Sequence, residues 1–286
     1  MPKHFAVIGD PVDHSLSPAI HHKLYEIYGI NAVYHKLLIP RNQIPKQLMT
    51  LVKEYRLDGF NVTMPHKQAV IPFLAGISKE ATIACSVNTV CCRQDGLHGY
   101  TTDAKGFCRA VAGGGRQTKG LPVVFLGAGG VCGALALHWG LQEQGPITII
   151  ARNPAKAQLL VDHLKQQGVS SLTLLEWTME NLEQAVKHTP LLVNTTPLGM
   201  AGCPDDFSDL SFLRRLPQDA LVYDLIYQPR QTALLQAAKE RGLQTANGID
   251  MLIYQAMEAF TLFVGVPTKD QDKTAILHSL EQQGLV

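Results

Sequence analysis

A glycine-rich loop between an apolar strand and a helix constrains the fold of this chain more than any other feature. The apolar run Leu121–Leu126 is followed by Gly127–Gly133, which contains four glycines. A helix is expected from there to about Gln144, and Ile147–Ala151 is expected to form the next strand. This order is typical of a doubly wound dinucleotide-binding unit, in which glycines allow a tight turn and let backbone N–H groups approach a pyrophosphate. A purely structural glycine turn is the alternative.

The residues after the second of these strands indicate which dinucleotide is bound. An NAD site usually has Asp or Glu there to accept a hydrogen bond from the ribose 2′-OH. This chain has Ala151-Arg152-Asn153, with Lys156 shortly after, so there are two cations and no carboxylate. A guanidinium can bind a 2′-phosphate through two parallel, charge-assisted hydrogen bonds. The pattern therefore favours a 2′-phosphate site, and hence NADP, over the alternative that the two cations are solvated surface charges without a ligand. The candidate cofactor-binding residues here are Gly127, Ala128, Gly129, Gly130, Val131, Ala151, Arg152, Asn153 and Lys156.

The part of the chain before this unit also alternates strands and helices. A helix is expected to begin with Ser17 as N-cap and Pro18 at its first position, and to end at Gly29. Asp95-Gly96 is a favourable hairpin turn between Asn88–Arg93 and Leu97–Tyr100. The other expected elements are strands at Phe5–Gly9, Ala32–Ile39 and Phe60–Thr63 and a helix at Asn42–Tyr55.

These patterns predict an α/β protein of two domains. Residues 1–105 form a mixed α/β domain with a mostly parallel sheet, and residues 106–247 form the Rossmann-type domain. The helices expected at Asp250–Val264 and Asp270–Gln283 pack back on the first domain, which residues 248–286 therefore complete. The glycines at 113–115 suit a hinge near the domain boundary. The two domains are expected to close on each other about the segments Gly106–Gly115 and Thr245–Gly248.

Composition and charge exclude several classes of function. With 286 residues, 46% of them hydrophobic, the chain can bury a substantial core. Its net charge is only +1, so no basic surface for binding nucleic acid or a membrane is expected. No apolar run approaches ~18 residues, and Met1–Phe5 lack the apolar core of a signal peptide. Six cysteines without a CxxC pair indicate a reducing, cytoplasmic setting. His14, His21 and His22 have no ligand partners at zinc spacing, so no metal is expected.

Two polar turns suggest catalytic residues. Lys67 follows the short apolar strand expected at Phe60–Thr63 and is expected in the first turn of a helix, where its ammonium could donate a proton. A surface charge is the alternative for such a lysine. The second turn, Gly99–Asp103, ends in a carboxylate shortly before the glycine loop. Together with that loop, Lys67 and Asp103 predict redox chemistry on a polar small molecule.

The ordered motifs resemble those of the shikimate dehydrogenase family over essentially the whole chain. They are Val7–Pro11, His14–Pro18, Gly59–Thr63 with Pro65 and Lys67, Val87–Thr89, Thr102-Asp103, Gly106-Phe107, the loop at Gly127, Asn194–Met200, Asp224 with Tyr227 and Pro229, and Gly248 with Met251 and Gln255. The resemblance implies NADPH-linked, reversible reduction of 3-dehydroshikimate to shikimate, in the chorismate pathway to aromatic amino acids.

The resemblance also implies a role for each matching residue. Ser15, Ser17 and Tyr227 would bind the substrate carboxylate, and Lys67 and Asp103 would be the catalytic pair. The ring hydroxyls would be bound by Thr63, Asn88, Asp103 and Gln255, and Leu225 and Gly248 would join the cofactor site. Helix capping is a rival role for the two serines.

The chain departs from the family pattern at Lys79, Cys85-Ser86, Thr101 and Ala151. An NAD-preferring quinate/shikimate dehydrogenase and a non-catalytic dinucleotide-binding regulator are the alternative functions. Arg152 opposes the first alternative, and the presence of Lys67 and Asp103 opposes the second. Either a monomer or a homodimer is compatible with the sequence.

Overall fold

The computed structural model describes residues 1–286, which divide into two compact units. Met1–Gly106 and Leu252–Val286 form the first unit, and Phe107–Met251 form the second. None of the helices combines the length and the apolar character that a membrane crossing requires. The α/β class and the two-domain layout expected from the sequence are confirmed.

A six-stranded sheet forms the centre of the first unit, with the order β2-β1-β3-β5-β6-β4. β1 pairs in parallel with β2 and β3, and the hairpin of β5 and β6 adds antiparallel strands beside β3. The strands are β1 (Lys3–Gly9), β2 (Ala32–Leu38), β3 (Gly59–Val62), β4 (Gly76–Ile77), β5 (Thr89–Arg93) and β6 (Gly96–Tyr100). The expected hairpin around Asp95-Gly96 is therefore present.

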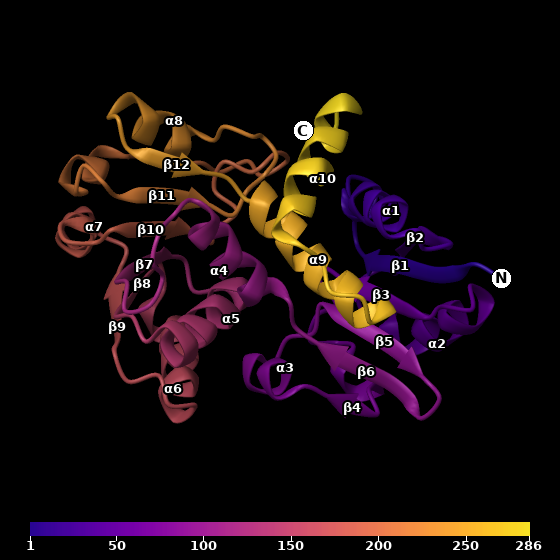
Figure 1. Cartoon of the computed structure of the whole chain (residues 1–286). Coiled ribbons are helices and arrows are strands. Elements are labelled where there is room, and N and C mark those ends of the chain that lie inside the picture. The colour runs from indigo at the N-terminus through magenta and orange to yellow at the C-terminus, as the bar shows by residue number, and fades with distance from the viewer. The chain divides into compact units, whose positions relative to one another are not determined.

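The C-terminal helices belong to the first unit, as expected. α10 packs beside α1, and the Tyr28 hydroxyl of α1 donates a 2.5 Å hydrogen bond to Asp272 of α10 (Figure 1). The helices of this unit are α1 (Ser17–Tyr28), α2 (Ile44–Glu54), the 3₁₀ turn η1 (Ile71–Phe73), α3 (Lys79–Ala84), α10 (Asp270–Gln282) and most of α9 (Ile249–Val264).

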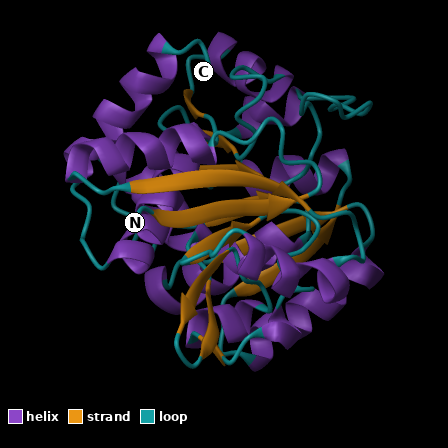
Figure 2. Ribbon diagram, turned by 90° about the vertical axis from the view of Figure 1, so that its right-hand side faces the viewer, coloured by secondary structure: helices purple, strands orange, loops and turns teal.

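The second unit has a fully parallel sheet with the order β12-β11-β10-β7-β8-β9. This is the doubly wound order: β8 and β9 are added on one side of β7, and β10, β11 and β12 on the other, so the strand order reverses between β7 and β10. The strands are β7 (Val123–Leu126), β8 (Ile147–Ala151), β9 (Leu172–Glu176), β10 (Leu191–Asn194), β11 (Leu221–Asp224) and β12 (Gln244–Ala246). Figure 2 draws the strands of both units in orange and the helices that flank them in purple.

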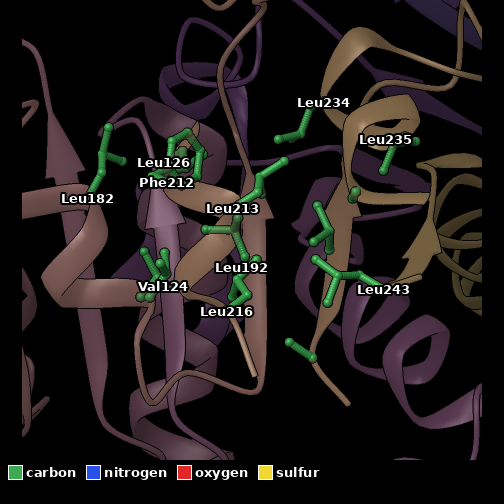
Figure 3. Close-up of a cluster of buried hydrophobic side chains, with 14 of the residues drawn as sticks. Val124, Leu126, Leu182, Leu192, Phe212, Leu213, Leu216, Leu234, Leu235 and Leu243 are labelled. Atoms are coloured by element: carbon green, nitrogen blue, oxygen red, sulfur yellow. The ribbon is translucent and has the colours of Figure 1, made fainter. Parts of the chain in front are cut away.

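The helices of the second unit cover both faces of its sheet. They are α4 (Asp103–Gly113, from Phe107 onward), α5 (Gly130–His138), the π-helix η2 (Trp139–Glu143), α6 (Pro154–Gln166), α7 (Met179–Val186), the 3₁₀ turn η3 (Ser211–Arg215) and α8 (Ala233–Glu240). On one face, Val124 and Leu126 of β7 pack into a core with Leu182, Phe212 and Leu234 from α7, η3 and α8 (Figure 3). Phe125 lies between those two β7 residues and points to the other face, where its ring is 6.4 Å from that of Phe107 in α4.

Two expected helix starts are wrong. Leu16, not Ser17, is the N-cap of α1, and no side chain caps that helix. Lys67 lies in a run of turns that leads into η1, not in an α-helix. Most of the backbone hydrogen bonds there are of the short i→i−3 kind, such as Ile71 N to Gln68 O, and Pro72 has no N–H with which to continue an α-helix.

The glycines at 113–115 do not mark the boundary between the units. The division falls between Gly106 and Phe107, inside α4, and Gly113 is the last residue of that helix. The second crossing falls between Met251 and Leu252, inside α9. Two helices, and not a loop of glycines, therefore join the units.

Candidate active site

Lys67 and Asp103 form an ion pair in the first unit. The Lys67 Nζ lies 2.6 Å from Asp103 Oδ2, and the side chains are 28% and 10% exposed, respectively. Lys67 follows β3, whereas Asp103 follows β6 and is the first residue of α4, where a negative charge is favoured by the helix dipole. Both residues expected to be catalytic are thus brought together, half-buried, from positions 36 residues apart.

Asn88 holds the other oxygen of this carboxylate. Its Nδ2 donates to Asp103 Oδ1 at 2.8 Å and to Thr102 Oγ1 at 2.9 Å. Its Oδ1 accepts the backbone N–H of Thr102 at 2.9 Å. The Oε1 of Gln255, on α9, lies 3.3 Å from the same Nδ2. Four of the polar residues expected in the site therefore share one hydrogen-bonded cluster: Lys67, Asn88, Asp103 and Gln255.

Thr63 directly follows β3 and lies against Gly9 at the end of β1. A Cβ on Gly9 would come within 2.2 Å of the Thr63 Cγ2, so this close approach requires a glycine. The backbone carbonyl of Thr63 accepts the N–H of His66, and His66 is buried with its Nε2 2.6 Å from the Ile39 carbonyl. These contacts hold the turn that carries Lys67.

Ser15 and Ser17 lie at the start of α1. The Ser15 hydroxyl accepts the backbone N–H of Ser17 at 3.3 Å, and Ser17 is buried. Tyr34, on β2, is buried as well. Burial raises the pKa of Tyr34 well above its ordinary value, so this phenol is a neutral donor.

Sequence reasoning did not find three buried residues beside this site, Tyr34, Asn61 and His21. The Tyr34 hydroxyl donates to Asn61 Oδ1 at 2.6 Å. The ring of His21 stacks on Tyr34 with centroids 4.5 Å apart, and burial lowers the pKa of His21 to about 3, so the ring is neutral. The only sequence signal for these three residues was that Asn61 lies inside the Gly59–Thr63 motif.

The glycine loop of the second unit is open in front of the N-terminus of α5. Gly127 has φ +100°, and a Cβ there would lie 2.7 Å from Thr196 Cγ2, so both the turn and the close contact require glycine. At Gly129 and Gly130 a Cβ would meet nothing within 4 Å, and no side chain caps the helix. Uncapped N–H groups facing open space fit a pyrophosphate. Ala128 and Val131 lie in the same loop and first turn.

The residues after β8 are arranged as the sequence suggested. Ala151 is buried at the end of the strand, and Arg152 and Lys156 are both exposed. Asn153 is the N-cap of α6, because its Oδ1 accepts the N–H of Lys156 at 3.0 Å. Its side-chain oxygen therefore already has a structural role. Because β8 and β7 are parallel neighbours, Arg152 lies at the same carboxyl edge of the sheet as the glycine loop.

Leu225 and Gly248 lie in direct contact in the second unit. A Cβ on Gly248 would be 1.9 Å from the Leu225 carbonyl oxygen, so only glycine fits. Leu225 directly follows β11, at the same carboxyl edge of the parallel sheet. Tyr227 also belongs to this unit, and burial raises its pKa, whereas Ser15 and Ser17 belong to the first unit.

One group in the second unit has the composition of a metal site but is assigned no metal. Cys108, His138 and Glu143 bring three possible ligand atoms within 4.8 Å of one another. However, the Thr118 hydroxyl already donates to Glu143 at 2.7 Å. Burial, and then the charge of Glu143, raise the pKa of Cys108 to about 12, so its thiol is protonated. The three histidines considered in the sequence, His14, His21 and His22, are not part of this group.

Comparison with known proteins gives the family. The family model of the shikimate dehydrogenase substrate binding domain matches residues 7–90. A shikimate dehydrogenase (NADP(+)) of Desulforamulus reducens is 36% identical over 279 residues, which cover 97% of this chain and 95% of the relative.

Solved structures agree over the same length. Shikimate 5-dehydrogenase of Thermus thermophilus in complex with NADP(H) and shikimate aligns with a TM-score of 0.80 at 32% identity, covering 97% of this chain and all of that one. Quinate dehydrogenase of Corynebacterium glutamicum in complex with NAD has a TM-score of 0.85 at 30% identity, covering 98% and 99%. The chain therefore belongs to the shikimate dehydrogenase family.

Proposed function

We propose that this chain is an NADP-dependent shikimate dehydrogenase, which reversibly reduces 3-dehydroshikimate to shikimate in the biosynthesis of chorismate and the aromatic amino acids. The observation that supports the proposal most is the Lys67–Asp103 ion pair at 2.6 Å, with Asn88 bound to the second carboxylate oxygen. An ammonium held in this way among neutral amides and hydroxyls suits proton transfer to the carbonyl oxygen of a hydroxyl-rich ring.

Reduction of a ring ketone requires a hydride at carbon and a proton at oxygen. NADPH, when bound, supplies the hydride. In our proposal the Lys67 ammonium donates the proton to the carbonyl oxygen, and in the reverse direction its neutral amine takes the proton from the alcohol. Asp103 orients the Lys67 ammonium throughout, because its other oxygen is fixed by Asn88.

The remaining roles in the first unit follow from its donors and acceptors. Thr63, Asn88, Asp103 and Gln255 are proposed to bind the ring hydroxyls. The hydroxyls of Ser15 and Ser17 are proposed to bind the substrate carboxylate as neutral donors. For Tyr227, in the second unit, the same role at the carboxylate is proposed. The first unit is thus the substrate-binding and catalytic domain.

The second unit is proposed to bind NADP. The open positions at Gly129 and Gly130 support a pyrophosphate at the start of α5. Arg152 and Lys156 are the cations proposed to bind the 2′-phosphate, and Leu225 and Gly248 are proposed to contact the cofactor.

An NAD-preferring quinate dehydrogenase is the second candidate, because a quinate dehydrogenase in complex with NAD has the same fold at 30% identity. The exposed Arg152 after β8 favours NADP, since an NAD site places a carboxylate there. A non-catalytic regulator has no need for a half-buried lysine–carboxylate pair.

Initial rates of NADPH formation from shikimate and NADP⁺ test the proposal, with quinate and NAD⁺ in the other three combinations. We expect the highest kcat/KM with shikimate and NADP⁺. A preference for quinate and NAD⁺ would instead establish the second candidate, and no turnover with any combination would support the regulator.

A cytoplasmic setting and a monomer or homodimer are also proposed. The six cysteines are all free, which is consistent with a reducing compartment. Sedimentation equilibrium would distinguish the two oligomeric states.

A further inference from the structure

We propose that His66 is a positioning residue for the Lys67 ammonium in the proposed reaction. Its imidazole ties the turn that carries Lys67 to the end of β2, and it acts on catalysis only through Lys67. The sequence motifs assigned no role to His66, although it lies between Pro65 and Lys67. The inference rests on the proposed function, because it takes Lys67 as the group that donates the proton.

The imidazole of His66 makes a buried hydrogen bond to a backbone carbonyl. His66 is 1% exposed, and its Nε2 lies 2.6 Å from the carbonyl oxygen of Ile39, which directly follows β2. A carbonyl oxygen can only accept, so the ring carries a proton on Nε2. Ile39 is itself fully buried, and the structure gives its carbonyl no other donor. Without the imidazole, a buried acceptor would therefore lose its partner, which is unfavourable.

Backbone hydrogen bonds hold the same turn on its other sides. The Asp10 N–H, just after β1, donates to the Met64 carbonyl at 2.9 Å. The Val87 N–H, just before β5, donates to the Lys67 carbonyl at 2.9 Å. The His66 side chain adds the bond to the end of β2. The turn is thus tied to three separate segments of the first unit.

The segment before β5 holds both partners of the ion pair. Val87 binds the backbone of Lys67, and the next residue, Asn88, donates from its Nδ2 to Asp103 Oδ1 at 2.8 Å. His66 fixes the residue just before Lys67. Lys67 therefore has a bonded anchor at its own carbonyl and at the preceding side chain, and its ammonium lies 2.6 Å from Asp103 Oδ2.

Loss of the His66 anchor should affect proton transfer more than substrate binding. A lysine side chain is flexible, so its backbone must be held if the ammonium is to stay in one place. A displacement of about 1 Å in a reacting group can lower a rate by roughly 10²-fold. Most of the residues proposed to bind the ring hydroxyls, namely Asn88, Asp103 and Gln255, lie on other segments and keep their contacts.

Three substitutions of His66 separate the hydrogen bond from the shape of the ring. His66→Gln brings an amide NH₂ close to the position of Nε2 and should keep kcat with shikimate within about threefold of that of the unaltered enzyme. His66→Asn carries the same amide on a shorter side chain that does not reach the Ile39 carbonyl. His66→Phe keeps a flat ring without a donor. Both should lower kcat roughly tenfold or more and change KM for shikimate less than about threefold.

His98→Asn is the matched control. His98 also belongs to the first unit and also bonds through Nε2, but its partner is the carboxylate of Asp95, at 3.0 Å in the hairpin turn before β6. Asp103 follows the other end of that strand. The kcat of this variant should therefore equal that of the unaltered enzyme.

A double-mutant cycle with Lys67→Ala tests whether His66 acts through Lys67. The Lys67→Ala enzyme has no ammonium left to position, so adding His66→Asn should lower its residual kcat by less than about twofold. A merely structural role of His66 would lower kcat by the same factor in both backgrounds.

These results decide the inference. Normal kcat in folded His66→Asn or His66→Phe, or equal losses with and without Lys67, would overturn it and leave the proposed function intact. If neither variant folds, His66→Gln decides, because a folded His66→Gln enzyme with a tenfold lower kcat would also overturn it. Absence of shikimate turnover by the unaltered enzyme would overturn the proposed function as well.

Discussion

Replacing Asp224 by asparagine should remove a pH-dependent loss of stability from the second unit. Asp224 ends β11 and is fully buried. Its Oδ1 accepts the Asn194 side-chain NH₂ at 3.0 Å and the Ile226 backbone N–H at 3.1 Å, and its Oδ2 accepts the Thr232 hydroxyl at 2.6 Å. Burial nevertheless dominates and raises the pKa of Asp224 from 3.8 to about 6.

The size and sign of the effect follow from that shift. Because the folded-state pKa exceeds the unfolded value, the folded state binds more protons between these two values, and stability falls as pH rises through them. A shift of about two units corresponds to roughly 3 kcal/mol in full, of which about 2 kcal/mol falls between about pH 4.5 and 7.5. The amide of an asparagine at this position cannot ionise. The free energy of unfolding of Asp224→Asn, relative to the unaltered protein, should therefore rise by about 2 kcal/mol over this range.

Urea unfolding at a series of pH values, followed by tryptophan fluorescence, measures this difference. Trp139 and Trp177 are the only tryptophans of the chain and both belong to the second unit, so the signal reports on the unit that contains Asp224. Asp219→Asn, at an exposed position of the same unit, is the control and should give a difference that does not vary with pH. A constant difference for Asp224→Asn as well would refute the reasoning, since the buried carboxyl would then ionise as readily as in the unfolded chain.

Three further predictions concern activity. Lys67→Ala should lower kcat by roughly 10²–10⁴ and leave KM for shikimate within a few-fold; a near-normal rate would remove Lys67 from the chemistry. Ser15→Ala and Tyr227→Phe should each raise KM for shikimate at least tenfold, about 1.4 kcal/mol for one lost hydrogen bond to an anion, and unchanged values would locate the carboxylate elsewhere. Arg152→Ser should raise KM for NADP⁺ at least tenfold, about 1.4 kcal/mol, and not KM for NAD⁺. Lys156→Ala should act in the same sense more weakly, because an ammonium lacks the planar fork of a guanidinium; equal losses with both dinucleotides would show that these cations do not bind the 2′-phosphate.

Local patterns in the sequence were enough to predict several elements of both units. The strand at Ile147–Ala151 has the predicted bounds, and the hairpin around Asp95-Gly96 and the glycine loop at Gly127 have the predicted form. These features depend on neighbouring residues, through apolar runs, turn residues and the freedom of glycine, and a sequence displays them directly. Short strands at sheet edges, such as β9 and β12, were not predicted, because they are partly exposed and lack a continuous apolar run.

Tertiary structure decided how the polar side chains are connected. The sequence indicated Lys67, Asn88 and Asp103 as separate motifs, but their bonds exist because β3, β5 and β6 are neighbours in one sheet. The hydrogen bonds from Tyr34 to Asn61 and from Asn61 to Thr89 likewise join β2, β3 and β5. No local pattern distinguishes these three side chains from ordinary strand residues. A buried donor must find an acceptor wherever packing places one, so the partners of buried polar groups are set by the fold and not by their neighbours in sequence.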